Sequence, residues 1–204
     1  MNAAAGRRLA LGMAMLIGGA AAVAAPVEIR VTGSSGQPLA GAVVFLEPRD
    51  GPPPAVPPQK AEISQVGRKF VPEVTIVPVG TAVDMPNRDT VRHHVYSLSK
   101  AKRFELKLYV GTPASPVVFD QTGIAVLGCN IHDNMTAWVV IVDTPWYGQT
   151  GADGRLVLAA VPPGRFRLRA WHPLMEVGAT PIEQPLQIGA VAVSANVALA
   201  GLRP

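Results

Sequence analysis

The chain has 204 residues, with 20 glycines and 20 prolines, and this composition favours short strands and turns and excludes a coiled coil. Hydrophobic residues make up 49% and charged residues 16%, which excludes a disordered tail. Aromatic residues make up only 5%, which argues against a protein that stacks nucleobases. The formal net charge is +4, and the one cysteine, Cys129, excludes an intramolecular disulfide and a zinc site built from several cysteines.

Residues 1–24 predict an export signal. Two arginines precede an uncharged run over 9–23 that ends in small residues. The run is shorter than the roughly 20 apolar residues of a membrane span, so we expect cleavage after Ala24 or Ala25 rather than an anchor. Cleavage removes both arginines and no acidic residue, so the net charge falls from +4 to +2. We therefore expect a nearly neutral periplasmic protein that binds neither nucleic acid nor, after cleavage, a membrane.

Alternation of apolar and polar residues predicts strands along the whole mature chain, and no segment has a sustained helical period. The proline-rich segment from Asp50 to Pro58 predicts a stiff extended linker. The short spacing of the strands after it predicts a β-sandwich over 59–143 and an all-β fold. The predicted strands are 27–32, 41–46, 73–77, 82–85, 93–98, 104–109, 117–119, 124–127, 136–142, 155–158 and 165–171, with further strand material over 186–199.

The two ends of the chain resemble one carboxypeptidase-regulatory-like, transthyretin-like β-sandwich. The residues that carry the likeness are 36–44 in the first part, and 150–158 and 161–168 in the second. The resemblance implies that 25–58 and 144–204 form one discontinuous domain, with 59–143 inserted in one of its loops. In the alternative organisation, the two ends and the segment between them are three separate units that follow one another along the chain.

Four polar residues near the C-terminus are expected to have structural roles. Arg165, Arg167 and Arg169 alternate on one strand face and are expected to coat an exposed sheet edge. His172 follows this strand and is expected to pack at its end.

The most informative motif is Cys129, His132 and Met135, which places a thiol, an imidazole and a thioether at intervals of three. Cysteine and methionine are soft ligands and imidazole suits copper, so the set favours copper over calcium, magnesium or manganese. A blue-copper centre needs a second histidine, and the adjacent pair His93 and His94 lies on a predicted strand. Only one of the two can face a metal, because side chains alternate across a strand. Apolar neighbours lie on both faces, so this pattern leaves both His93 and His94 open.

The segment 59–143 resembles a small cupredoxin. The likeness is carried by the Cys-x2-His-x2-Met spacing, which is similar to that of amicyanin, and by residues 70–76, 80–83, 86–89 and 93–95. The resemblance implies one type 1 copper ion, with Cys129 as thiolate ligand, His132 as the ligand near the surface that passes the electron, and Met135 as a long axial ligand. Alignment with the family's pattern favours His93 as the second histidine ligand, with His94 as the alternative. The whole chain also resembles exported bacterial proteins labelled "methylamine utilization".

These observations predict a periplasmic type 1 copper protein that carries single electrons between redox protein partners. Two histidines, one cysteine and one methionine leave no open position for a substrate, so we expect a carrier and not an enzyme. Copper trafficking or storage is an alternative, and a non-redox β-sandwich binding module is another.

Overall fold

The structure, a computed structural model, describes residues 24–203; the predicted export signal, apart from its last residue, lies outside the described residues. Residues 24–203 form seventeen strands and no helix, so the described chain is all-β, as predicted. Accordingly, none of this part of the chain forms a helix that could cross a membrane.

Seven strands from the two ends of the chain form one pair of sheets, here called the outer unit. In the first sheet, β1 (Ala25–Thr32) lies between β14 (Arg155–Val161) and β17 (Val193–Ala198). It pairs antiparallel with β14 and parallel with β17. The second sheet has the order β13-β2-β15-β16, with bounds Tyr147–Gln149, Val43–Pro48, Gly164–Trp171 and Ile182–Ile188.

The remaining ten strands form the inner unit. Its largest sheet has the order β6-β12-β11-β8-β9, with bounds Val74–Pro78, Thr136–Val142, Gly123–Cys129, His93–Ser99 and Lys102–Tyr109. A second sheet has the order β10-β7-β3, with bounds Val117–Phe119, Thr81–Asp84 and Lys60–Glu62. The short strands β4 (Ser64–Val66) and β5 (Lys69–Val71) pair antiparallel with each other.

Strand β12 is buried on both faces and links two hydrophobic cores. Ala137, Val139 and Ile141 belong to the core of the inner unit. The alternate side chains of the same strand, among them Trp138, belong to a second cluster, which also contains the core residues of the outer unit. This explains why the strand has a continuous apolar sequence instead of an alternating one.

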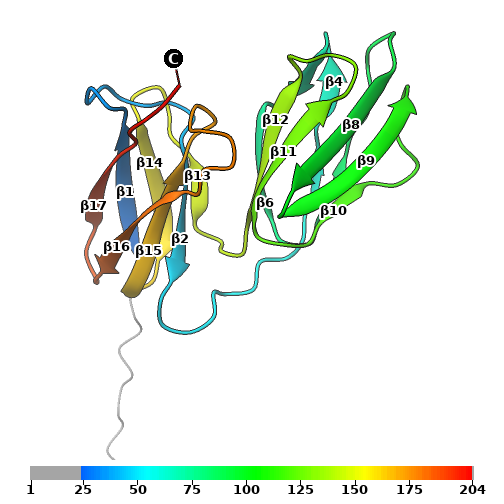
Figure 1. Cartoon of the computed structure of the whole chain (residues 1–204). Helices are drawn as coiled ribbons and strands as arrows, with labels where there is room; N and C mark the ends of the chain where they lie inside the picture. The colour runs from blue at the N-terminus through cyan, green and yellow to red at the C-terminus, as the bar shows by residue number, and fades with distance from the viewer. Residues whose placement is uncertain (1–23, 204) are drawn as a thin grey trace, which may run out of the picture.

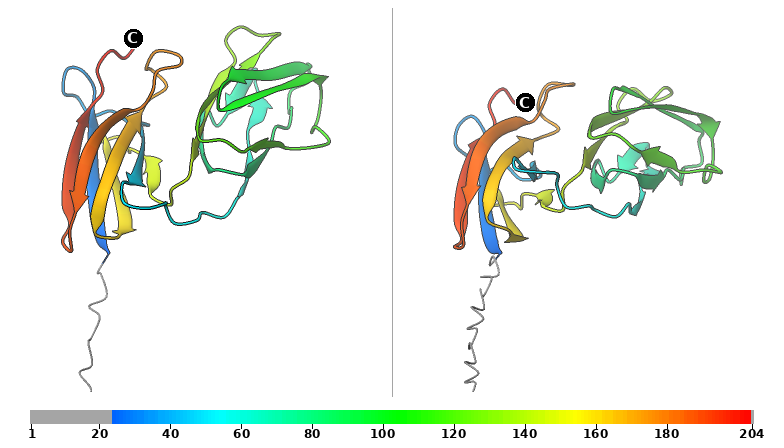
Figure 2. Two further views of the ribbon diagram at one scale, coloured as in Figure 1. Left: turned by 60° about the horizontal axis from the view of Figure 1, so that its bottom comes forward. Right: turned by 90° about the horizontal axis from the view of Figure 1, so that it is seen from below.

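The two units lie side by side, and the chain passes between them twice at the same end (Figures 1 and 2). The first crossing is the predicted proline-rich linker, and residues 49–59 contain no strand. The second crossing follows β12 and leads into β13. The rings of Trp138 and Trp171 lie 6.2 Å apart between the units, beside a cavity of about 790 Å³.

The expectation that Arg165, Arg167 and Arg169 coat a sheet edge is wrong. Their strand, β15, lies between β2 and β16 inside its sheet. Each guanidinium group instead pairs with acidic side chains of the neighbouring segments: Arg165 with Asp50, Arg167 with Glu47 and Glu183, and Arg169 with Glu47.

Candidate metal centre

Two neighbouring strands and one tight loop bring three metal-binding side chains together. His93 is the first residue of β8, and Cys129 is the last residue of the adjacent strand β11, where it pairs with Val95. His132 lies in the loop between β11 and β12. The loop is held at both ends, because Asn130 N–H donates to the carbonyl oxygen of His94 over 3.0 Å and Met135 N–H donates to that of His132 over 3.1 Å.

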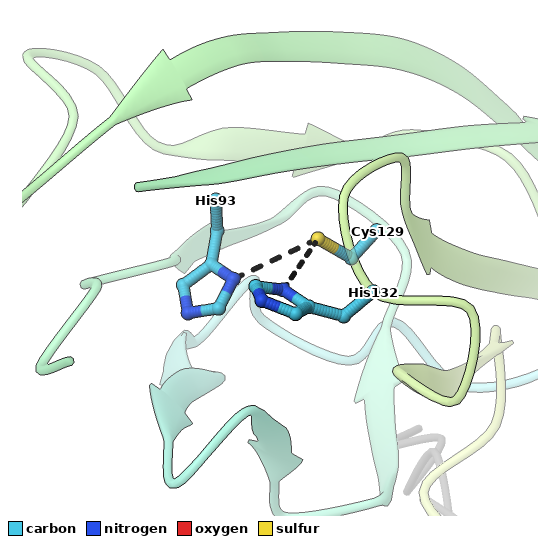
Figure 3. Close-up of side chains that lie close together, drawn as sticks. All are labelled: His93, Cys129 and His132. Atoms are coloured by element: carbon cyan, nitrogen blue, oxygen red, sulfur yellow. Dashed lines mark hydrogen bonds between the residues drawn. The ribbon is translucent and has the colours of Figure 1, made fainter. Parts of the chain in front are cut away.

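The donor atoms of His93, Cys129 and His132 lie within 4.8 Å of one another. Cys129 Sγ is 3.6 Å from His93 Nδ1 and 3.8 Å from His132 Nδ1 (Figure 3). The side chain of His93 is fully buried and Cys129 is 6% exposed, whereas His132 is half-buried. The two imidazole rings are tilted by 58° with centroids 5.0 Å apart.

These separations match those of ligands around one small metal ion. Bonds of about 2.3 Å to sulfur and about 2.0–2.1 Å to nitrogen, as around Zn²⁺, place sulfur and nitrogen about 3.5–3.8 Å apart for angles between tetrahedral and trigonal. The two sulfur–nitrogen distances fall at the two ends of this range. Cys129 Sγ therefore already lies at the distance from each imidazole nitrogen that a shared metal ion requires.

The structure separates the two adjacent histidines. His93 joins the cluster, while His94 projects to the opposite face of β8, where its Nε2–H donates to Glu105 Oε1 over 2.8 Å. Met135 is 2% exposed and lies in the same hydrophobic cluster as Cys129.

A carboxylate that sequence reasoning missed contacts the buried histidine. Asp89 Oδ2 lies 2.9 Å from His93 Nε2. Asp89 also accepts hydrogen bonds from Gly67 N–H over 2.6 Å and from Arg68 N–H over 2.9 Å. Asp89 lies in the loop before β8, and loop sequences have no periodic pattern that predicts side-chain contacts. The only sequence signal for this contact is that Asp89 is close to His93 in the chain.

The surroundings shift the acidity of two groups at this end of the inner unit. Burial alone disfavours the charged form of Asp89, but the hydrogen bonds donated by Arg68, His93 and Gly67 outweigh it, so the pKa of Asp89 is lowered. Burial raises the pKa of Tyr109 to about 12. The Tyr109 phenol therefore keeps its proton at neutral pH and acts as a hydrogen-bond donor, with Gln65 Oε1 at 2.7 Å.

No protein-family model and no curated protein matches this chain. Among solved structures, the chain is similar to a copper-containing nitrite reductase from Thermus scotoductus SA-01, with 23% identity, a TM-score of 0.39, and coverage of 47% of this chain and 25% of that chain. It is similar to a purple cupredoxin from Nitrosopumilus maritimus, with 23% identity, a TM-score of 0.36, and coverage of 40% and 99%. It is also similar to a mutant of amicyanin, with 21% identity, a TM-score of 0.37, and coverage of 48% and 99%. The chain thus spans a quarter of the nitrite reductase and nearly all of the two smaller proteins.

Proposed function

We propose that this protein binds one copper ion at a type 1 site and carries single electrons between redox proteins. The observation that carries the proposal is the cluster of one buried thiol, one buried imidazole and one half-buried imidazole, with all three donor atoms within 4.8 Å of one another. His93, Cys129 and His132 would bind the copper ion, and Met135, the third residue of the motif, would add a weak fourth bond. Two histidines, one cysteine and a long axial methionine are the ligand set of blue-copper electron-transfer sites.

Each residue of the cluster has a property that suits a carrier. A bound copper ion would supply the one-electron change between Cu(II) and Cu(I). Strand pairing fixes the backbone at Cys129 and at His93, and burial restricts the His93 side chain, so the ligands would need little rearrangement when the charge changes. His132 is half-buried and gives the electron a route to the surface. The set leaves no position for a substrate, so we propose a carrier and not an enzyme.

We also propose that the protein works in the periplasm and has two domains. The inner unit would be a cupredoxin-like domain over 59–143, and the outer unit a transthyretin-like domain formed by 25–58 and 144–204. Strand pairing supports this division, since the pairs found within residues 24–203 join strands of the same unit. Metal ligation would protect the single thiol of Cys129 from oxidation in an oxidising compartment.

The direct test is to add Cu(II) to the purified protein and record its visible spectrum. We expect an intense thiolate-to-copper band that Cys129→Ser abolishes. His93→Gln is expected to abolish or shift the band as well, because it removes a buried ligand. The matched control is His94→Gln, which changes the adjacent histidine on the other face of β8 and should leave the band unchanged. A wild-type spectrum that equals that of Cys129→Ser contradicts the proposal.

A second measurement separates electron transfer from copper delivery. A carrier should show a stable, reversible reduction potential and fast electron self-exchange. The burial of His93 and Cys129 favours retention of the metal ion. Rapid loss of copper to a mild chelator would instead indicate trafficking or storage, and absence of copper from protein purified out of a periplasmic extract would indicate a non-redox binding module.

A further inference from the structure

We propose that Asp89 is a positioning residue of the metal centre. Its carboxylate holds the proton of His93 on Nε2, so that Nδ1 faces the metal, and its negative charge lowers the reduction potential of the bound copper. This inference rests on the proposed function, because it concerns the same copper centre.

The contact between Asp89 and His93 fixes the tautomer of the imidazole. A carboxylate can only accept a hydrogen bond, so the 2.9 Å contact requires a proton on His93 Nε2. In a neutral imidazole the other nitrogen, Nδ1, then carries a free lone pair. Nδ1 is the nitrogen that lies 3.6 Å from Cys129 Sγ. The carboxylate and the sulfur therefore meet opposite sides of one buried ring.

Asp89 is itself held in place by the hairpin of β4 and β5. Gly67 N–H and Arg68 N–H donate to its two carboxylate oxygens over 2.6 and 2.9 Å. Arg68 has a φ of 58°, a left-handed conformation that is uncommon for a residue with a side chain. This turn aims two successive N–H groups at the carboxylate and keeps it from rotating away from His93.

Asn87 anchors the same loop from the other side. Its side-chain oxygen accepts from Asp89 N–H over 2.9 Å. Its side-chain nitrogen donates to the carbonyl oxygens of Val91 and Tyr109, each over 2.8 Å. Tyr109 pairs with His93 between β9 and β8. Asp89 is therefore connected both to the loop that precedes His93 and to the strand beside it.

The adjacent histidine provides an internal comparison. His94 Nε2 makes the same kind of contact, with Glu105 Oε1 at 2.8 Å. However, the side chain of Glu105 is 50% exposed, compared with 14% for Asp89, and His94 lies outside the metal-binding cluster. Water screens an exposed charge much more than a buried one, so only Asp89 is placed to influence the metal.

The chemical effect follows from charge. A carboxylate hydrogen-bonded to a metal-binding imidazole makes that imidazole a stronger electron donor. A stronger donor and a nearby negative charge both stabilise Cu(II) more than Cu(I), which lowers the reduction potential. Loss of such an outer hydrogen-bond partner typically costs about 10–100-fold in metal affinity.

The test compares Asp89→Asn with Glu105→Gln, since each replaces a histidine-bound carboxylate by the neutral amide of the same shape. We expect Asp89→Asn to keep the thiolate-to-copper band, to raise the reduction potential and to weaken Cu(II) binding about 10–100-fold. Glu105→Gln should leave the potential and the affinity at the wild-type values. Equal potential shifts in the two variants would overturn the inference, because a general change of charge would then explain both.

A measurement on the wild-type protein covers the case in which Asp89→Asn does not fold. In the diamagnetic Cu(I) protein, nitrogen-15 NMR should show a slowly exchanging proton on His93 Nε2. Absence of that proton overturns the inference. The two proposals fail separately: a wild-type protein without the visible band contradicts the copper site itself, whereas a normal band with an unchanged potential in Asp89→Asn contradicts only the role of Asp89.

Discussion

His93 and His172 are both buried, but their hydrogen bonds give them different chemistry. His93 binds Asp89 through Nε2 and leaves Nδ1 directed toward a sulfur atom. His172 uses both nitrogens on the backbone: Nε2–H donates to the carbonyl oxygen of Ala40 and Nδ1 accepts from Leu174 N–H, each over 3.1 Å. His172 therefore has no lone pair left for a metal, which agrees with its predicted structural role.

The surroundings of His172 predict a dependence of stability on pH. Burial lowers the pKa of His172 below its ordinary value of 6.5, and a proton on Nδ1 would break the hydrogen bond from Leu174. The unfolded chain therefore takes up this proton first as the pH falls. The stabilisation is fully present above pH 6.5 and is lost as the pH falls below that value toward the folded-state pKa.

Urea unfolding of the metal-free protein at several pH values checks this prediction. Wild type should lose free energy of unfolding between neutral pH and pH about 5. His172→Gln should lose less over the same interval, because glutamine does not titrate. An identical pH dependence in both proteins would contradict the prediction.

The residues of the cluster differ in how well the sequence could predict their placement. Cys129 and His132 stand at fixed spacing in one loop, so a local motif pointed to them. The choice between His93 and His94 was undecidable from apolar neighbours because both faces of β8 are covered. Val95 faces the core of the inner unit, whereas Tyr96 lines the cavity beside the outer unit.

At the scale of elements, prediction was best where the pattern is local. The bounds of β10 and β12 agree with the predicted strands over 117–119 and 136–142. The strands β3, β4, β5 and β13 were missed, because three residues each are too few to show a period. The strand β10 is equally short, but turn residues over 111–113 and 121–123 mark both of its sides. The arginines of β15 were misplaced for a related reason: whether a strand lies at an edge depends on the other strands of its sheet.

Two glycines with similar backbone conformations give a test of close packing in the outer unit. Gly154 has a φ of +72°, and a Cβ there would lie 2.5 Å from the carbonyl oxygen of Val31 and 3.0 Å from the backbone nitrogen of Leu39. Gly36 has a φ of +79° with nothing within 4 Å. Any substitution strains the left-handed backbone, but only at Gly154 must neighbouring backbone atoms also move.

We expect Gly36→Ala to lower the free energy of unfolding by about 1 kcal/mol and Gly154→Ala by about 3 kcal/mol. The larger effect should come from the clash, which displaces Val31 and the 2.8 Å hydrogen bond that its N–H donates to Gly154. Urea unfolding followed by tryptophan fluorescence measures both values. Equal losses would show that backbone strain alone accounts for the cost.

At the scale of the molecule, the two units share an apolar contact although they have separate sheets. Trp138 of the inner unit and Trp171 of the outer unit are 8% and 3% exposed, with ring centroids 6.2 Å apart. Such a pair contributes about 0.5–1.5 kcal/mol beyond the area it buries. The contact should couple the unfolding of the two units.

Calorimetry of two tryptophan variants tests this coupling. The wild-type protein is expected to unfold in one cooperative transition, and Trp138→Ala should separate it into two, because the variant removes the largest side chain that the inner unit contributes to the contact. Trp146→Ala is the matched control: Trp146 packs against Phe166 within the outer unit, with ring centroids 5.4 Å apart. It should lower the transition temperature without splitting the transition. A single transition in Trp138→Ala would mean that the covalent crossings and the remaining apolar contacts of β12 are enough to couple the units.

The double passage of the chain between the units has a consequence for proteolysis. A protease that cuts the exposed proline-rich segment opens one passage only, and the inner unit stays covalently attached through the passage after β12. Release of the inner unit requires a second cut in the other passage, where Thr144 is buried and donates a 2.6 Å hydrogen bond to the carbonyl oxygen of Leu46. A single nick therefore leaves the inner unit tethered to its partner unit.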